Sequence, residues 1–208
     1  MKSARITAIA LLAALLAACS GLRSAAPPER TYLLRAAPAA AGPAAVPGVL
    51  AVLRPAVQPG LDTDNIMLTR AGQELDHFAA SRWGEPLPRV IAALAVQSLA
   101  GGGGFANVVD AGSAVASDYE LLLTVRHFEA AYETEGAPPV IHVAFDCVLT
   151  TGSPRHVLGR CDAAASEPAA DNRMAAIVAA MEGAAQRALA DVRTAAVAAA
   201  ATRAPAPH

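Results

Sequence analysis

The sequence predicts an α+β fold in which a mostly antiparallel sheet carries two helices packed on one of its faces. Three observations support this prediction. Short segments with alternating apolar residues follow one another with turn residues between them, as in hairpins. Only two segments repeat apolar residues with the helical period. These two segments are far apart, which argues against the regular alternation of strands and helices typical of a parallel sheet.

The folded part begins with strands. Residues 31–34 are a short strand candidate. Residues 49–57 are a second one, which Pro55 ends or places at a sheet edge because proline has no N–H to donate. Residues 66–70 and 73–78 predict a β-hairpin across a tight turn.

The first helix follows this hairpin. Pro86 lies at its first turn, and the glycines at 101–104 end it before a strand at 105–109. A phosphate-binding loop would need glycines between a strand and the start of a helix, so we interpret this glycine run as a linker. The apolar stripe of the helix consists of Leu87, Val90, Ile91, Leu94 and Leu99.

Three longer strands and a second helix complete the domain. Alternating apolar residues predict strands at 119–128, 140–149 and 157–162. The second helix is expected to begin near Pro168. Its apolar stripe consists of Met174, Ile177, Val178, Met181, Leu189 and Val192.

The N-terminus resembles a lipoprotein signal peptide. Two basic residues precede the 13-residue apolar run from Ile6 to Ala18, which is too short to cross a hydrocarbon core of ~30 Å as a helix. The run ends in Leu-Ala-Ala-Cys, and Cys19 is the residue that bacterial lipoprotein processing acylates. Ser20, rather than Asp, follows and favours sorting to the outer membrane. The alternative is an ordinary secretory peptide with an incidental cysteine.

The chain therefore divides into four predicted parts. They are a signal peptide at 1–18, a lipidated N-terminus and tether at 19–29, a folded domain at 30–194, and a disordered Ala- and Pro-rich tail at 195–208. The hydrophobic share of 54% does not require a membrane span, because 54 of the 208 residues are alanine. Two or three acyl chains on Cys19 would anchor the protein stably instead.

The other two cysteines, Cys147 and Cys161, lie on two strands of one predicted hairpin. If the turn centres near Pro154, residues whose numbers sum to 308 face one another, and these two cysteines do. In an oxidising compartment we expect them to form a disulfide. The alternatives are two reduced core thiols, or a register that does not bring the two cysteines together.

No catalytic or metal-binding constellation stands out. His142 and Asp146 share a strand face, as do His127 and Glu129, but none of the five histidines has the spacing of a metal site. No nucleophile elbow, nucleotide-binding loop or zinc-protease motif occurs. We therefore expect no enzyme activity, metal or cofactor. A charged fraction of 16% and a formal net charge of −2 also argue against binding to nucleic acid.

Several short motifs after Cys19 resemble the family of ABC-type transport auxiliary lipoproteins, which includes paraquat-inducible protein C. The resemblance covers about residues 30–192, and its most specific motif is Arg82-Trp83-Gly84-Glu85-Pro86-Leu87. Gly60 and Gly84 depart from the aromatic residue and the alanine expected there. The other motifs are Tyr32-x-Leu34, Leu61-Asp62-x-x-x-Ile66-x-x-Arg70 and Tyr119-x-Leu121-x-x-x-Val125-x-x-Phe128.

The resemblance implies a compact α+β sandwich that serves an envelope ABC system without being an enzyme. Its partner would be a substrate-binding subunit with a mammalian-cell-entry (MCE) domain, in a system that moves lipids between the inner and outer membranes. The protein would dock this subunit from the outer membrane, facing the periplasm. Because MCE proteins form rings or tubes, a homo-oligomer is compatible with this role. The alternative is a lipoprotein activator or assembly factor of another envelope enzyme or secretion complex.

Three residues of the most specific motif, Arg82, Trp83 and Leu87, are candidates for partner binding. Trp83 either packs the start of the helix into the core or contacts the partner. Arg82 either pairs with Glu85 or Asp76 or faces the partner.

Overall fold

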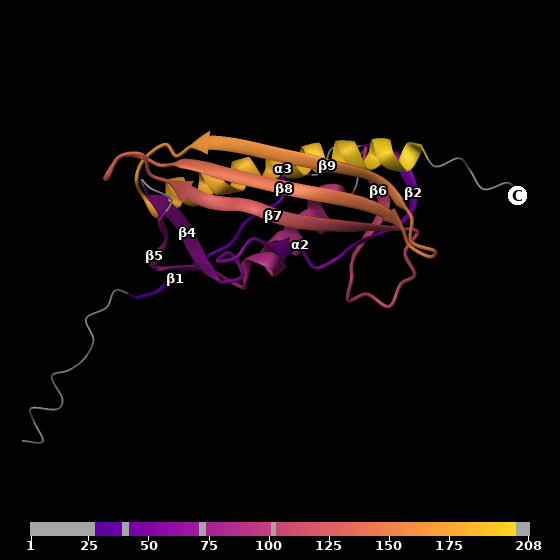
Figure 1. Cartoon of the computed structure of the whole chain (residues 1–208), viewed down its shortest axis with the longest axis horizontal. Coiled ribbons are helices and arrows are strands. Elements are labelled where there is room, and N and C mark those ends of the chain that lie inside the picture. Colours follow the sequence, from indigo (N-terminus) through magenta and orange to yellow (C-terminus); the bar gives the residue numbers. More distant parts are fainter. Residues whose placement is uncertain (1–27, 39–41, 71–73, 101–102, 203–208) are drawn as a thin grey trace, which may run out of the picture.

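The computed structural model describes residues 28–38, 42–70, 74–100 and 103–202. The predicted signal peptide, Cys19 and most of the tether lie outside these residues. Figure 1 shows the described elements. They are nine strands, which form one sheet, and two helices. Neither of these helices combines the length and the apolarity needed to cross a membrane.

Three long strands form one side of the sheet. They are β7 (Tyr119–Ala131), β8 (Val140–Thr151) and β9 (Val157–Pro168), and each is antiparallel to the next, as the alternating sequence predicts. Figure 1 shows them side by side. Apolar residues at every second position of β7 and β8 are buried on one face, so the period of two gives this part of the sheet its core side.

The other edge of β7 pairs with three short strands in succession. They are β2 (Val46–Val52), β3 (Ala56–Val57) and β4 (Asn65–Arg70), and all three run parallel to β7. The predicted strand at 49–57 is interrupted at residues 53–55, in keeping with the prediction that Pro55 ends it, so β2 and β3 are separate strands. Proline cannot donate to the ladder, so pairing stops and resumes on its far side.

Three further strands extend the sheet beyond these pairs. β5 (Glu74–Trp83) is antiparallel to β4, which confirms the predicted hairpin, and it continues past the predicted end. β1 (Arg30–Tyr32) runs parallel to β5, and β6 (Phe105–Asp110) runs parallel to β2. The long strand pairs are thus antiparallel, whereas most of the short ones are parallel.

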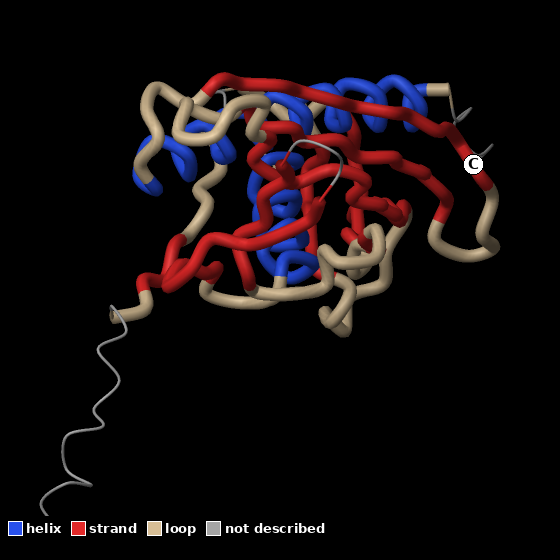
Figure 2. Tube along the Cα trace, turned by 60° about the vertical axis from the view of Figure 1, so that its left-hand side comes forward, coloured by secondary structure: helices blue, strands red, loops and turns tan. Residues whose placement is uncertain are grey.

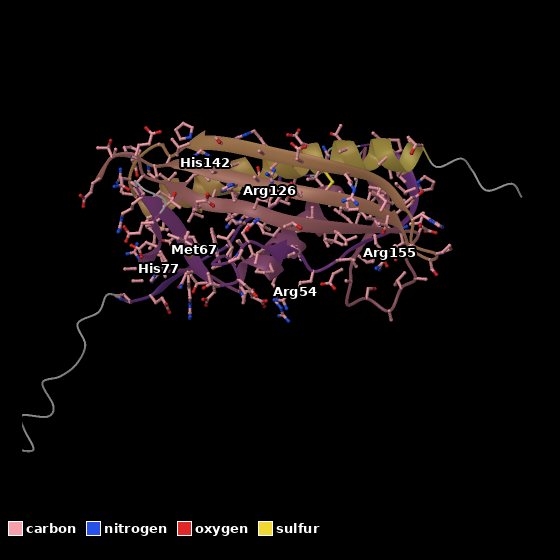
Figure 3. All side chains as sticks on the ribbon, viewed as in Figure 1. Arg54, Met67, His77, Arg126, His142 and Arg155 are labelled. Carbon is pink, nitrogen blue, oxygen red and sulfur yellow. A yellow bond between two sulfur atoms is a disulfide. The ribbon has the colours of Figure 1, made fainter. Side chains whose placement is uncertain are left out.

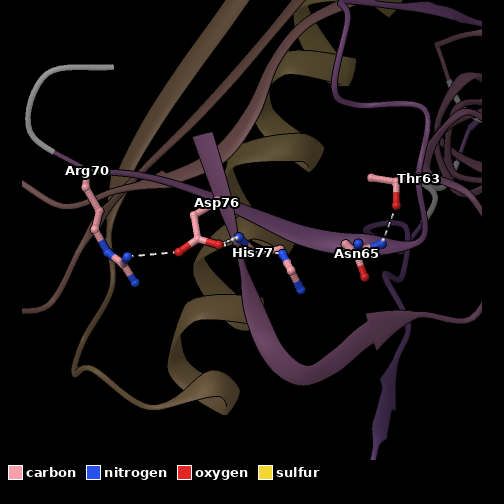
Figure 4. Close-up of polar contacts among 5 residues, drawn as sticks. All are labelled: Thr63, Asn65, Arg70, Asp76 and His77. Carbon is pink, nitrogen blue, oxygen red and sulfur yellow. Dashed lines mark hydrogen bonds and ion pairs between the residues drawn. The ribbon is translucent and has the colours of Figure 1, made fainter. Parts of the chain in front are cut away.

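An ion pair links the two strands of the β4–β5 hairpin. Arg70 Nη1 donates to Asp76 Oδ2 at 2.8 Å, and the backbone N–H of His77 donates to Asp76 Oδ1, also at 2.8 Å (Figure 4). The hydrogen bond from the backbone N–H of His77 is the main cause that lowers the pKa of the Asp76 carboxyl below its usual value. The positive charge of Arg70 lowers this pKa further. At the other end of β4, the N–H of Asn65 donates to Thr63 Oγ1 at 3.1 Å.

The first helix, α2 (Leu87–Leu99), begins one residue after Pro86 and carries Pro88 in its first turn. Both prolines are tolerated there, because the first N–H groups of a helix have no partner within the helix. The predicted stripe is confirmed at four positions, since Leu87, Ile91, Leu94 and Leu99 are buried, while Val90 is half-buried.

The second helix is α3 (Met174–Ala201), and its two ends correct the predicted boundaries. It begins six residues after Pro168, because β9 continues to that proline and a loop follows. Asn172 holds this loop by accepting a hydrogen bond from the Tyr132 hydroxyl and donating to the carbonyl of Gly136. At the other end, residues 195–201 are helical and do not belong to a disordered tail.

Both helices pack with the sheet around one core, and α3 lies along β8 and β9 (Figures 1 and 2). Alanines at the α3 interface and Gly159 on β9 permit this close approach. A Cβ atom at Gly159 would lie only 2.7 Å from the Cβ of Ala199. The abundant alanine of the sequence therefore serves a packing purpose in α3.

The predicted disulfide between Cys147 and Cys161 is confirmed. The two residues are directly opposite in the β8–β9 ladder, with Cα atoms 5.0 Å apart. Most other pairs of this ladder also sum to 308, and the sum changes only at the bulge before Thr150 and Val157. The turn near Pro154 thus sets the register of the whole hairpin.

Candidate functional site

An open groove of about 680 Å³ runs along the exposed side of α2. The helix forms its floor. Leu33 and Leu34, directly after β1, form part of one wall, while Arg54 and the turn at 110–112 line the groove from the β2 and β6 side. Figure 3 labels Arg54 near α2 at the edge of the molecule.

The two faces of α2 explain how the groove forms. One face of α2 packs in the core, so the opposite face of the helix lies at the protein surface. Glu85, just before the helix, and Arg89, Ala93 and Gln97 on it follow at intervals of four and line the groove. Gly84 also matters, because a Cβ atom there would lie 3.1 Å from Leu33 Cδ2, and its absence allows the leucine wall to lie close.

Two ion pairs include charged residues that line the groove. Arg89 Nη1 donates to Glu85 Oε2 at 2.9 Å, and this bond, with the charges of Glu85 and Asp110, raises the pKa of the Arg89 guanidinium. Arg54 Nη2 lies 3.6 Å from Asp62 Oδ1. Apolar groups such as Leu33 and Val90 lie among these pairs. The groove offers a mixed apolar and charged surface, which suits binding of another chain better than acid–base chemistry.

The three candidate partner-binding residues differ in exposure, because two of them are buried and only Arg82 is exposed. Trp83 is 1% exposed and packs edge-on against Phe128, with ring centroids 6.0 Å apart. Leu87 is 2% exposed. Both side chains therefore lie in the core, and the structure supports the packing interpretation of Trp83. Neither side chain can touch a partner without leaving its present position.

Arg82 is exposed and lies two residues before Gly84, which lines the groove. Its guanidinium lies 3.2 Å from Glu29 and 3.6 Å from Asp64, and not beside the predicted partners Glu85 and Asp76. Those two carboxylates pair with Arg89 and Arg70 instead. The prediction failed because strand alternation turns Arg82 toward the segment before β1, which is distant in sequence.

The groove includes residues that the sequence analysis did not select. The sequence places both Leu33 and Leu34 in a strand at 31–34, whereas they follow β1 and line the groove. Leu33 is 68% exposed, the highest value among the exposed large hydrophobic residues of the described chain. Two adjacent leucines beside a strand were the available signal, because alternation places at least one of them outside a core.

The family model described as ABC-type transport auxiliary lipoprotein component matches residues 32–193. This range spans the described sheet and helices apart from the first residues of β1 and the last turns of α3. A search of curated proteins finds no match.

Solved structures share the fold. A crystal structure of a protein from Xanthomonas campestris superposes with a TM-score of 0.65 at 22% identity, covering 82% of this chain and 94% of that one. The structure of a hypothetical protein from Chlamydia trachomatis superposes with a TM-score of 0.53 at 9% identity, covering 76% of this chain and 100% of that one. At these identities the likeness concerns the fold alone.

Proposed function

Because this chain belongs to the family of ABC-type transport auxiliary lipoprotein components, we propose that it is a non-enzymatic docking subunit of an MCE-type ABC system. It is anchored in the outer membrane through acyl chains on Cys19 and faces the periplasm. There it holds the MCE-domain substrate-binding subunit while lipids pass between the two membranes.

The observation that carries this proposal is the family match across nearly the whole folded domain, directly after a sequence with the features of a lipoprotein signal peptide. The match supports an accessory role in an ABC system. The Cys19 motif supports a place on a membrane surface, and Ser20 favours the outer membrane.

The groove along α2 is the surface that we propose for docking. Its lining combines apolar groups such as Leu33 and Val90 with members of two ion pairs, Glu85 with Arg89 and Arg54 with Asp62. This pattern fits an amphipathic helix of the MCE-domain partner, whose apolar stripe would lie on Leu33 while its flanking charges meet those pairs. Arg82, two residues before Gly84 of the groove lining, would add a charged contact to the partner.

Crosslinking in intact envelopes followed by purification of the lipoprotein tests the proposed function. We expect the MCE-domain subunit of the same system to be recovered, together with further copies of the lipoprotein. Recovery of a different envelope enzyme or secretion complex, with no MCE-domain protein, would reject the proposal in favour of an activator or assembly factor.

A matched pair of variants tests the docking surface separately. Leu33→Asp introduces a charge beside the groove, whereas Val157→Asp introduces the same charge at an exposed position, 56% exposed, at the start of β9. We expect recovery of the partner to fall about tenfold or more for the first variant and to stay unchanged for the second. Equal recovery in both would move docking away from the groove without affecting the proposed role.

A further inference from the structure

A second depression, of about 350 Å³, lies on the outer face of the three long strands. It is lined by His127 and Glu129 of β7, His142 of β8 and Ser166 of β9, among others. Figure 3 labels His142 on this part of the sheet. This site is separate from the groove along α2 and shares no lining residue with it.

The strand register places the two histidines on the same face of adjacent strands. Glu129 pairs with His142 across the β7–β8 ladder, and His127 pairs with Ala144 two residues further along. The histidines are therefore diagonal neighbours on one face, a separation of about 7–8 Å between backbones that long side chains can bridge. Ala144 and Ala164 lie opposite His127 in the next two strands and leave the space beside the rings open.

Both rings are held through the same nitrogen. His127 Nδ1 lies 2.7 Å from Glu129 Oε1, and His142 Nδ1 lies 2.9 Å from Ser166 Oγ. An ionised carboxylate only accepts, so in the neutral ring Nδ1 of His127 carries the proton and Nε2 presents a lone pair. Metal-binding histidines are oriented in this way, with one ring nitrogen donating to a carboxylate or another oxygen while the other binds the metal.

Glu129 is itself fixed. The residue is only 8% exposed, and its Oε2 accepts a hydrogen bond of 2.6 Å from the backbone N–H of Phe128. A buried carboxylate that is held on both oxygens keeps the His127 ring in one orientation and adds negative charge beneath the depression. Both effects favour a cation bound to the exposed nitrogens.

We propose that His127 and His142 bind one divalent transition-metal cation of the zinc class through their Nε2 atoms, with Glu129 as the positioning residue for His127. Imidazole is a preferred ligand of such cations. The described residues contain no group of three or more side chains able to hold a metal ion. Water or a donor from another molecule therefore completes the coordination, and the bound cation is open to exchange.

Calorimetric titration of the full lipidated chain in detergent with Zn²⁺ tests this proposal, with a purification tag that contains no histidine. We expect one site, at least a tenfold weaker affinity for His127→Ala and for His142→Ala, and no binding at this site for the double variant. Glu129→Gln keeps the shape of the side chain but weakens its hold on the ring, and we expect a loss of about 10- to 100-fold.

His77→Ala and His156→Ala are the matched controls, because each removes a histidine that does not line this depression. They should bind Zn²⁺ as the wild type does. Unchanged affinity in the His127 and His142 variants, or an equal loss in the controls, would overturn the proposal. Far-UV circular dichroism of each variant separates loss of ligands from loss of fold.

Discussion

Trp83 shows how one residue can suggest a binding site and belong to the core. It precedes a helix, it is the only tryptophan, and it lies in the most specific motif of the family resemblance. In the folded chain it joins β5 to the core through Phe128 of β7. Its value to the protein is therefore the area that it buries where several elements meet.

Replacement of this residue should reduce stability strongly. For Trp83→Ala we expect a loss of about 3–5 kcal/mol in the free energy of unfolding, because the truncation leaves a cavity that the core fills only in part. Urea unfolding followed by circular dichroism measures this loss. Leu33→Ala, at an exposed position, should change stability by no more than about 0.5 kcal/mol. A comparable loss in both variants would contradict the core role.

Asp76 illustrates a charged residue with a pH-dependent contribution. Its folded-state pKa is lowered, so its contribution is present above the unfolded value of about 4 and is lost as the pH falls through the folded value. We therefore expect Asp76→Asn to be less stable than the wild type at neutral pH and equally stable in strong acid. Urea midpoints of both proteins over this pH range test the prediction, and a gap that widens toward acid would contradict it.

At the scale of elements, the contact between α3 and β9 depends on small residues. The helix lies close enough that Gly159 meets Ala199 without room for a side chain. Gly183 on α3 is similarly close to the carboxylate of Glu167, whose Oε2 lies 2.8 Å from Arg187 Nη1 of the next helical turn. Small side chains here set the distance between helix and sheet.

A larger residue on the strand should push these elements apart. For Gly159→Val we expect a loss of about 1–3 kcal/mol in the free energy of unfolding, because overpacking forces a shift of the last turns of α3. Ala164→Val adds bulk to the same strand at an exposed position and should be tolerated. If chemical denaturation gives equal stability for the two variants, the packing argument is incorrect.

The pairing of strands was predicted only where a short turn connects strands that are adjacent in sequence. The β8–β9 register follows from one turn between adjacent strands, so a count along the chain was sufficient to align Cys147 with Cys161. The parallel pairing of β2, β3 and β4 with β7 joins segments about 60–70 residues apart. Because no short turn links such segments, their pairing could not be predicted from the sequence.

At the scale of the whole molecule, the proposed anchor and the folded domain have separate tasks. Cys19 would attach the chain to the membrane, and the domain from β1 onward would meet the partner. Eight residues lie between Cys19 and Pro28, where the described chain begins, and the nine steps from Cys19 to Pro28 span at most about 32 Å when extended. The domain is therefore expected to stay near the membrane surface.

Loss of the acylated thiol should release the protein without unfolding it. We expect Cys19→Ala to move from the membrane fraction to the soluble fraction on flotation, because the acyl chains and not the domain bind the bilayer. Circular dichroism should show an unchanged fold. Flotation of the variant with the membranes would show that another part of the chain holds it there.

The sequence by itself determined the α+β class, the apolar stripes of both helices, the long antiparallel hairpin with its disulfide, and the family resemblance. These features depend on local periodicity, on one turn and on short motifs, all of which are encoded within neighbouring residues. Only the tertiary structure decided the partners of Arg82, the burial of Trp83, the groove between Leu33 and α2, and the placement of His127 and His142 on one face of adjacent strands. Each of these features involves residues from separate elements. Their positions relative to one another are set only when the elements pack together and bury their apolar faces.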